Sequence, residues 1–268
     1  MKNHDMSKQK KNWKGVVVAS GILVGALAVL LMFPTAGTLA QSGGYGSPQV
    51  VPPNEEAFAL SYGEWAGRWW QWAGWGMPVA TNPITDTTGV DCALGQWGPV
   101  FFLTGSTGGP SVVRSCTIPP GKGLFFPIAN SACAVPEDGA TPAEAAGLCS
   151  GFTDLVDVSS LKVTIDGVAL HHLGQFRTPS PIYSFTGNAP NFCSVNCCTN
   201  LTPHCYEGFH AQGVGDGYYV MLKPLRAGHH TLHFHAEMPA NGPGGTQDVT
   251  YHLNVLKGHE EKEAKDDK

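Results

Sequence analysis

The residues best suited to chemistry are histidines near the C-terminus, in the run GHHTLHFHAE from Gly228 to Glu237. In an extended strand every second residue projects to the same face, so His229, His233 and His235 share one side of the strand. Imidazoles grouped in this way are ligands for copper, zinc or nickel. The alternative is a hydrated strand face on which histidine fills outward positions and binds nothing.

A second strand extends this candidate metal site. We expect the last two strands to form a hairpin in which Phe234 lies opposite Tyr251, because that register pairs their apolar faces. The same register places His252 opposite His233. The candidate ligands for a transition metal are therefore His229, His233, His235 and His252.

A stripe of tryptophan forms the second notable group, in a predicted helix that begins after Asn54 as its N-cap. Trp65, Trp69 and Trp72 recur on one side of this helix. Such a stripe is typical of a helix that packs against a core, where each ring buries roughly 150–250 Å². The alternative is an aromatic platform that stacks on sugar rings.

Two carboxylates, Asp86 and Asp91, lie in the Gly-containing loop TDTTGVD at residues 85–91. Hard cations such as calcium accept carboxylate and carbonyl oxygens from loops of this kind. The loop lacks the alternating ligands and the closing Glu of an EF-hand. Acidic residues in such loops more often form turns, which is the alternative reading of this pair.

Charge and motif content narrow the function. The chain of 268 residues holds 16 basic and 21 acidic residues, and removing the charged termini 1–14 and 257–268 leaves 7 and 15. A net charge of −8 argues against nucleic acid, which requires clustered Lys and Arg. The sequence has no nucleophile elbow, zincin helix or P-loop. We therefore expect a non-catalytic binding or structural module, with a metal-dependent oxidoreductase or a carbohydrate-binding module as alternatives.

The first forty residues predict export. Five lysines precede an uncharged run from Gly15 to Phe33, and small residues follow up to Ala40, which is the pattern of a cleaved signal peptide. An uncleaved membrane anchor is the alternative, because this run approaches the ~20 residues that span a bilayer. In either case the rest of the chain is expected to be secreted, periplasmic or on the cell surface, with a cell-envelope or glycan partner.

Eight cysteines follow the signal segment. An even number of cysteines in an oxidising compartment predicts disulfide bonds, and we expect Cys92 to pair with Cys116 and local bridges to form within residues 193–205. A zinc site built from the cysteines of that segment and His204 is the alternative. The eight residues are Cys92, Cys116, Cys133, Cys149, Cys193, Cys197, Cys198 and Cys205.

The remaining pattern predicts one all-β domain over residues 54–256, a mainly antiparallel β-sandwich or jelly roll with the Trp-rich helix and one further short helix. Residues 41–53 are expected to be a flexible linker and 257–268 a disordered charged tail. The second helix should run from about 142 to 156, because Thr141 and Glu144 have the spacing of a capping box. Strands are expected at 99–104, 111–118, 124–128, 161–166, 182–186, 218–223, 231–237 and 249–256.

The chain also resembles a group of secreted prokaryotic proteins in the order of its motifs, which are GEWAGRWWQWA, NPITDTTGVDCALGQWGPVFFL, PPGKGLFFPIAN, VTIDG and GHHTLHF with DVTYHLNV. This resemblance covers nearly the whole chain after the signal segment. It implies a single exported domain and carries no activity. The cysteine-rich segment at 191–205 departs from the group's pattern, so its bridges are not expected to be general to the group.

Overall fold

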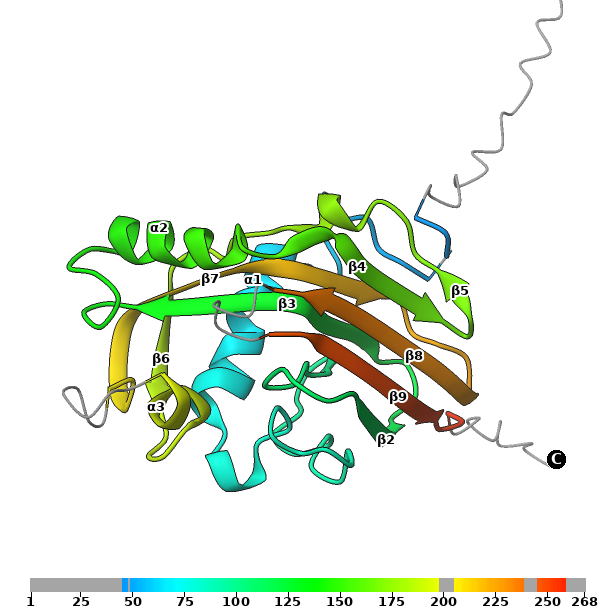
Figure 1. Ribbon diagram of the computed structural model, residues 1–268. Helices are drawn as coiled ribbons and strands as arrows, with labels where there is room; N and C mark the ends of the chain where they lie inside the picture. Colours follow the sequence, from blue (N-terminus) through cyan, green and yellow to red (C-terminus); the bar gives the residue numbers. More distant parts are fainter. Residues whose placement is uncertain (1–44, 48, 198–204, 239–244, 259–268) are drawn as a thin grey trace, which may run out of the picture. The chain divides into compact units, whose positions relative to one another are not determined.

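Two mixed β-sheets form the framework of the protein in the computed structural model, which describes residues 45–47, 49–197, 205–238 and 245–258 (Figure 1). The first sheet has the order β1 (Val100–Phe102), β3 (Gly123–Ala134), β7 (Gly208–Leu222) and β6 (Tyr183–Gly187). The second has the order β2 (Val112–Ile118), β9 (Gln247–Val255), β8 (Gly228–Glu237), β4 (Asp157–Ile165) and β5 (Val168–Ala169).

Each sheet contains one parallel pair, which lies at an edge of the sheet. The expectation of mainly antiparallel pairing is wrong only for these two edge pairs. β1 pairs in parallel with β3, and β2 pairs in parallel with β9, whereas the other pairs are antiparallel. The cause is the order of the chain. It leaves the first sheet after β1, forms β2 at the edge of the second sheet, and returns as β3 beside β1.

Helical segments cover these sheets. α1 (Tyr62–Trp69) continues without interruption into a π-helical turn, η1 (Trp70–Gly76). α2 (Pro142–Thr153) contacts β3 and β7, and α3 (Phe192–Asn196) contacts η1. Short 3₁₀ turns occur at η2 (Val79–Thr81) and η3 (Leu173–Phe176). The sequence predicted the Trp-rich helix and α2, whose N-cap Thr141 accepts a hydrogen bond from Glu144, but it did not predict α3.

The start of the Trp-rich helix differs from the prediction. Ser61, and not Asn54, is the N-cap, and it forms a capping box with Glu64. The chain just before it cannot be helical, since Phe58 and Ala59 have φ values of 53° and 65°. The acidic residues after Asn54 suggested an earlier start, but a capping box satisfies two backbone N–H groups and fixes the first turn at Tyr62.

Long strands reach beyond the predicted limits. β7 spans fifteen residues, of which only its C-terminal part was predicted, because the segment 208–217 contains four glycines that weaken a strand signal. β3 pairs with β7 along almost its whole length, with a bulge between Pro127 and Ala129. Figure 1 shows β3 and β7 extending past the second sheet toward α2 and α3.

Aromatic rings join the layers of the core. Phe126 of β3 stacks on Phe234 of β8 with ring centroids 5.2 Å apart, so the two sheets face each other at this point. Phe125 stacks on Tyr219 at 5.3 Å within the first sheet, on the side covered by α1. All four of these residues are fully buried.

Part of the expected linker belongs to the fold. Val50 and Val51 are each 5% exposed, and the amide of Val51 donates to the Met221 carbonyl of β7. The rest of the linker up to residue 44, the signal segment 1–40 and tail residues 259–268 lie outside the described residues. Within the described ranges, no helix is long and apolar enough to cross a membrane.

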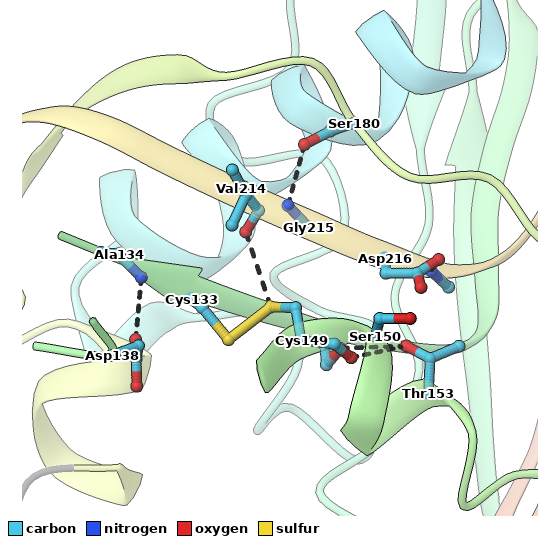
Figure 2. The surroundings of a disulfide bond; sticks show 12 residues. Cys133, Ala134, Asp138, Cys149, Ser150, Thr153, Ser180, Val214, Gly215 and Asp216 are labelled. Carbon is cyan, nitrogen blue, oxygen red and sulfur yellow. Dashed lines mark hydrogen bonds between the residues drawn. A yellow bond between two sulfur atoms is a disulfide. The ribbon is translucent and has the colours of Figure 1, made fainter. Parts of the chain in front are cut away.

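Disulfide bonds staple the domain and indicate an oxidising, extracytoplasmic compartment. Cys92 is bonded to Cys116, as predicted. A second bridge joins Cys133 of β3 to Cys149 of α2 beneath Val214 (Figure 2), so both are bridged as expected, although their pairing was not predicted. Among the other cysteines, Cys205 is also disulfide-bonded, whereas Cys193 and Cys197 are free thiols.

Candidate functional site

A cavity of about 390 Å³ beside β3 is the candidate binding site. Its volume lies within the roughly 300–1,000 Å³ typical of small-molecule sites. Its lining comes from residues 127–132 of β3, the junction of α1 and η1, the end of α2, the helix α3, Ile84, the loop 105–107, and Met238 and Gln247 near the ends of β8 and β9.

The α1–η1 junction supplies an aromatic wall. Trp69 and Trp70 both line the cavity. Their polar N–H groups are already engaged, because Trp69 donates to the Leu103 carbonyl at 2.9 Å and Trp70 to the Tyr219 hydroxyl at 3.0 Å. The two indoles therefore offer mainly ring surface to a ligand. A π-helical turn at this position is notable because such turns are frequent at functional sites.

Most polar groups around the cavity are used by the protein itself. The amide of Gln247 accepts from the backbone of Ser106 and donates to it, and Ser131 is hydrogen-bonded to Thr153 and the Cys149 carbonyl. Asn130 is different. Its side chain interacts with the Tyr219 hydroxyl, but its buried Nδ2 has no hydrogen bond of normal distance and angle to any described residue. Asn130 is thus the side chain whose donor a ligand could engage more fully.

Two thiols complete the wall on the side of α3. Asn191 caps this helix, and Cys193 and Cys197 lie four residues apart on it, so their side chains meet on one face. The two thiols share a hydrogen bond. Burial raises the pKa of Cys193, and the hydrogen bond from Cys193 lowers the pKa of Cys197.

Carboxylates lie behind the thiol pair. Asp138 accepts hydrogen bonds from the Ala134 amide (Figure 2) and from the Tyr206 hydroxyl at 2.9 Å, and burial raises its pKa. Glu137 accepts from His210 at 2.8 Å, although its second oxygen, Oε2, is buried without a donor among the described residues. Burial raises the pKa of Glu137, but its hydrogen bonds, led by that from His210, together lower the pKa by more than burial raises it. The net pKa is therefore below the ordinary value.

The predicted histidine hairpin exists, but its register is shifted by two residues. Phe234 lies opposite Val249, and Leu232 lies opposite Tyr251. The shift keeps the apolar faces paired, because both registers alternate correctly, and only the detailed packing selects between them. As a result His252 lies opposite Thr231 and not opposite His233.

The four candidate metal ligands remain on one sheet face without converging. His233 is engaged with Asp248 at 2.7 Å and His235 with Glu237 at 3.3 Å, whereas His229 and His252 lie at exposed positions nearer the other end of the hairpin. No group of three His, Cys, Asp or Glu side chains suited to a metal ion occurs in the part of the chain that the structure describes.

The other predicted site residues have structural roles. Trp65, Trp69 and Trp72 are 1%, 2% and 5% exposed, which favours the interpretation as core packing over an open sugar platform on the surface, although Trp69 also lines the cavity. Asp86 uses both carboxylate oxygens to organise its own loop, accepting from the amides of Thr88 and Asp91. The alternative zinc set loses Cys205, which is disulfide-bonded, and its members Cys198 and His204 lie outside the described residues.

Sequence reasoning missed the cavity, Asn130 and the free thiols. A cavity formed by segments far apart in the chain leaves no local pattern. The thiol pair did have a signal, since Cys193 and Cys197 are spaced i and i+4 behind Asn191, which is a good N-cap. The neighbouring cysteines concealed that signal by suggesting disulfides throughout the segment.

Comparisons with known proteins add no assignment. No family model matches the chain, and no curated protein matches it. A match among solved structures is the solution structure of amebosin, which is 12% identical, covers 59% of this chain and 100% of that chain, and superposes with a TM-score of 0.21. A likeness at this level carries no argument, so the candidate site is judged by its own geometry.

Proposed function

We propose that this protein is an exported, non-catalytic binding module that holds a small, largely apolar ligand in the cavity beside β3. The observation that supports this most directly is the cavity itself, with its volume of about 390 Å³ and its walls of tryptophan, phenylalanine, isoleucine and valine. Apolar walls with a few placed polar groups are characteristic of small-molecule sites.

Specificity would come from few groups. The poorly satisfied donor of Asn130 is suited to a carbonyl, ether or hydroxyl oxygen of the ligand, because a buried donor without a well-placed acceptor is costly. The absence of any cationic side chain from the described lining disfavours a strongly acidic ligand. A neutral molecule with one polar end meets both conditions.

The location of the module is part of the proposal. The lysine-rich segment with its uncharged run predicts export, and the disulfides Cys92–Cys116 and Cys133–Cys149 favour an oxidising compartment. An extracytoplasmic position, whether secreted, periplasmic or at the cell surface, would expose the cavity to ligands outside the cytoplasm.

The test is binding of the neutral fluorescent probe 6-propionyl-2-(dimethylamino)naphthalene, which is apolar apart from one carbonyl end, to the purified protein. Ala132 lines the cavity and is half-buried, so Ala132→Phe should fill part of the space and weaken binding about tenfold or more. Ala143→Phe, at an exposed position of α2 away from the cavity, is the matched control and should bind as the wild type does. Equal affinity of both variants would contradict the proposal, as would the lack of binding by the wild type.

A further inference from the structure

The feature that goes beyond ligand binding is the pair of free thiols on α3. The described cysteines elsewhere, Cys92, Cys116, Cys133, Cys149 and Cys205, are all disulfide-bonded. Cys193 and Cys197 are not, although they share a hydrogen bond. These two thiols lie close together and are reduced, whereas the other described cysteines are bridged. The pair therefore does not serve as a structural disulfide.

A bond between the two sulfurs requires a rearrangement of the turn that carries them. Residues four apart on a helix have Cα atoms roughly 6 Å apart, within the range of roughly 4.4–6.8 Å found in disulfides, but their Cβ atoms lie about 5–6 Å apart, and a disulfide needs about 3.5–4.5 Å. α3 is only five residues long, and Cys197 is its C-cap, so closing a bridge would disturb one short turn and no long element. The pair can therefore exist in an open and a closed form.

The two thiols are not equivalent. Cys193 is 3% exposed, whereas Cys197 is exposed to solvent. The hydrogen bond from Cys193 favours the thiolate at Cys197 and lowers its pKa, although partial burial and, more weakly, the carboxylate of Asp138 disfavour the thiolate. An accessible nucleophile beside a buried partner is the arrangement that thiol–disulfide exchange requires.

We propose that Cys193 and Cys197 form a thiol–disulfide exchange site whose substrates are small-molecule disulfides. The Cys197 thiolate attacks one sulfur of the substrate, the substrate S–S bond breaks, and a mixed disulfide forms with release of the first thiolate. Cys193 then attacks the Cys197 sulfur and forms the Cys193–Cys197 bond. The second thiolate leaves with the proton that Cys193 loses, so one disulfide and two protein thiols become one protein disulfide and two small thiols.

This activity is independent of the cavity ligand, although both cysteines lie on the cavity wall. It needs only the sulfur pair and access to Cys197. Failure of the fluorescent probe to bind would therefore leave it standing, and failure of exchange would leave the proposed binding function standing.

The test uses oxidised glutathione and the whole exported protein, followed by intact mass and peptide mapping. The wild type should lose two hydrogens, gain no adduct, and yield a peptide bridged between Cys193 and Cys197. Cys193→Ser should retain one glutathione on Cys197, because the resolving thiol is missing. Cys197→Ser should react at least about tenfold more slowly than the wild type, because its remaining thiol is buried.

A measurement on the wild type alone guards against variants that fail to fold. In glutathione buffers of increasing oxidised fraction, the Cys193–Cys197 bridge should increase while the Cys92–Cys116 bridge stays constant. A pair that stays reduced in every buffer, a wild type that keeps a glutathione adduct, or a Cys197→Ser variant that reacts at the wild-type rate would each overturn the proposal.

Discussion

The guanidinium of Arg114 donates a hydrogen bond to the hydroxyl of Tyr251, 2.8 Å away, in the interior of the domain. Arg114 is 1% exposed, and its other acceptors are the Thr104 hydroxyl and four backbone carbonyls. The acceptors lie on the loop 84–86, on residues 104–105 and on β9. One buried cation thus ties two N-terminal loops to the last strand of the fold.

Replacing this cation by a shorter one should be costly. Arg114→Lys keeps the charge but has three donors on one nitrogen, so several buried carbonyls lose their partner. We expect the free energy of unfolding to fall by about 2–4 kcal/mol, measured by urea denaturation. Arg226→Lys, at an exposed position, is the control and should change it by less than about 0.5 kcal/mol. Equal effects of the two substitutions would contradict the role of Arg114.

The helix start offers a comparison between the observed cap and the one that the sequence suggested. Ser61→Ala removes the acceptor for the Glu64 amide and should destabilise the protein by about 1 kcal/mol. Asn54→Ala lies outside the helix and should have almost no effect. Thermal unfolding of both variants checks this, and a larger loss at Asn54 than at Ser61 would show that the helix begins earlier.

The pair of His230 and Asp166, 2.7 Å apart, should make stability depend on pH. Burial lowers the pKa of His230, but its hydrogen bonds to Asp166 and the Arg226 carbonyl raise it more, and the net pKa is above 6.5. Burial raises the pKa of Asp166, but the hydrogen bond from His230 leaves it below 3.8. The pair therefore stabilises the fold fully between the two ordinary pKa values, that is between pH 3.8 and pH 6.5. Its contribution is lost as pH rises through the raised pKa of His230 or falls through the lowered pKa of Asp166.

A double-mutant cycle isolates this pair. His230→Gln should lower the free energy of unfolding more at pH 5.5 than at pH 8.5, by less than about 1 kcal/mol because the pair is near the surface. In an Asp166→Asn background the same substitution should lose most of its pH dependence, because only the bond to the Arg226 carbonyl remains. Urea titrations at the two pH values measure both effects, and an undiminished pH dependence in that background would exclude Asp166 as its main cause.

The metal hypothesis from the sequence has its own test. Since His233 is engaged with Asp248 and lies opposite Thr250, we expect less than one equivalent of copper, zinc or nickel on untagged protein. Elemental analysis after dialysis against each metal, with the His233→Ala and His235→Ala double variant beside it, decides the question. A stoichiometric metal that the double variant loses would restore the hairpin as a metal site.

Local patterns accounted for much of the fold. The capping residues of α2, the alternating strands β2, β4, β8 and β9, and the Cys92–Cys116 bridge were all predicted in place. Each depends on residues close in sequence or on a simple period. The predicted start of α1 at Asn54 was wrong, although the sequence contains the capping box of Ser61 and Glu64. The acidic residues that follow Asn54 competed with this signal.

The candidate site was much less predictable. The histidine face was found, but a shift of two residues preserves the alternation of apolar and polar positions, so the sequence could not distinguish the two registers. The parallel pairs β1–β3 and β2–β9 depend on how the chain crosses between sheets, which no local pattern records.

By itself the sequence determined the β-rich class, the Trp-rich helix and the use of disulfides, and it predicts an export signal, because composition, period and spacing are local properties. Only the tertiary structure decided that Asn130 lies with Trp69 and Trp70 around a cavity. It also decided that Cys193 and Cys197 are free thiols and not part of a disulfide. Cavities and sulfur pairings arise from packing between distant segments, and their energies depend on distances that a one-dimensional pattern does not contain.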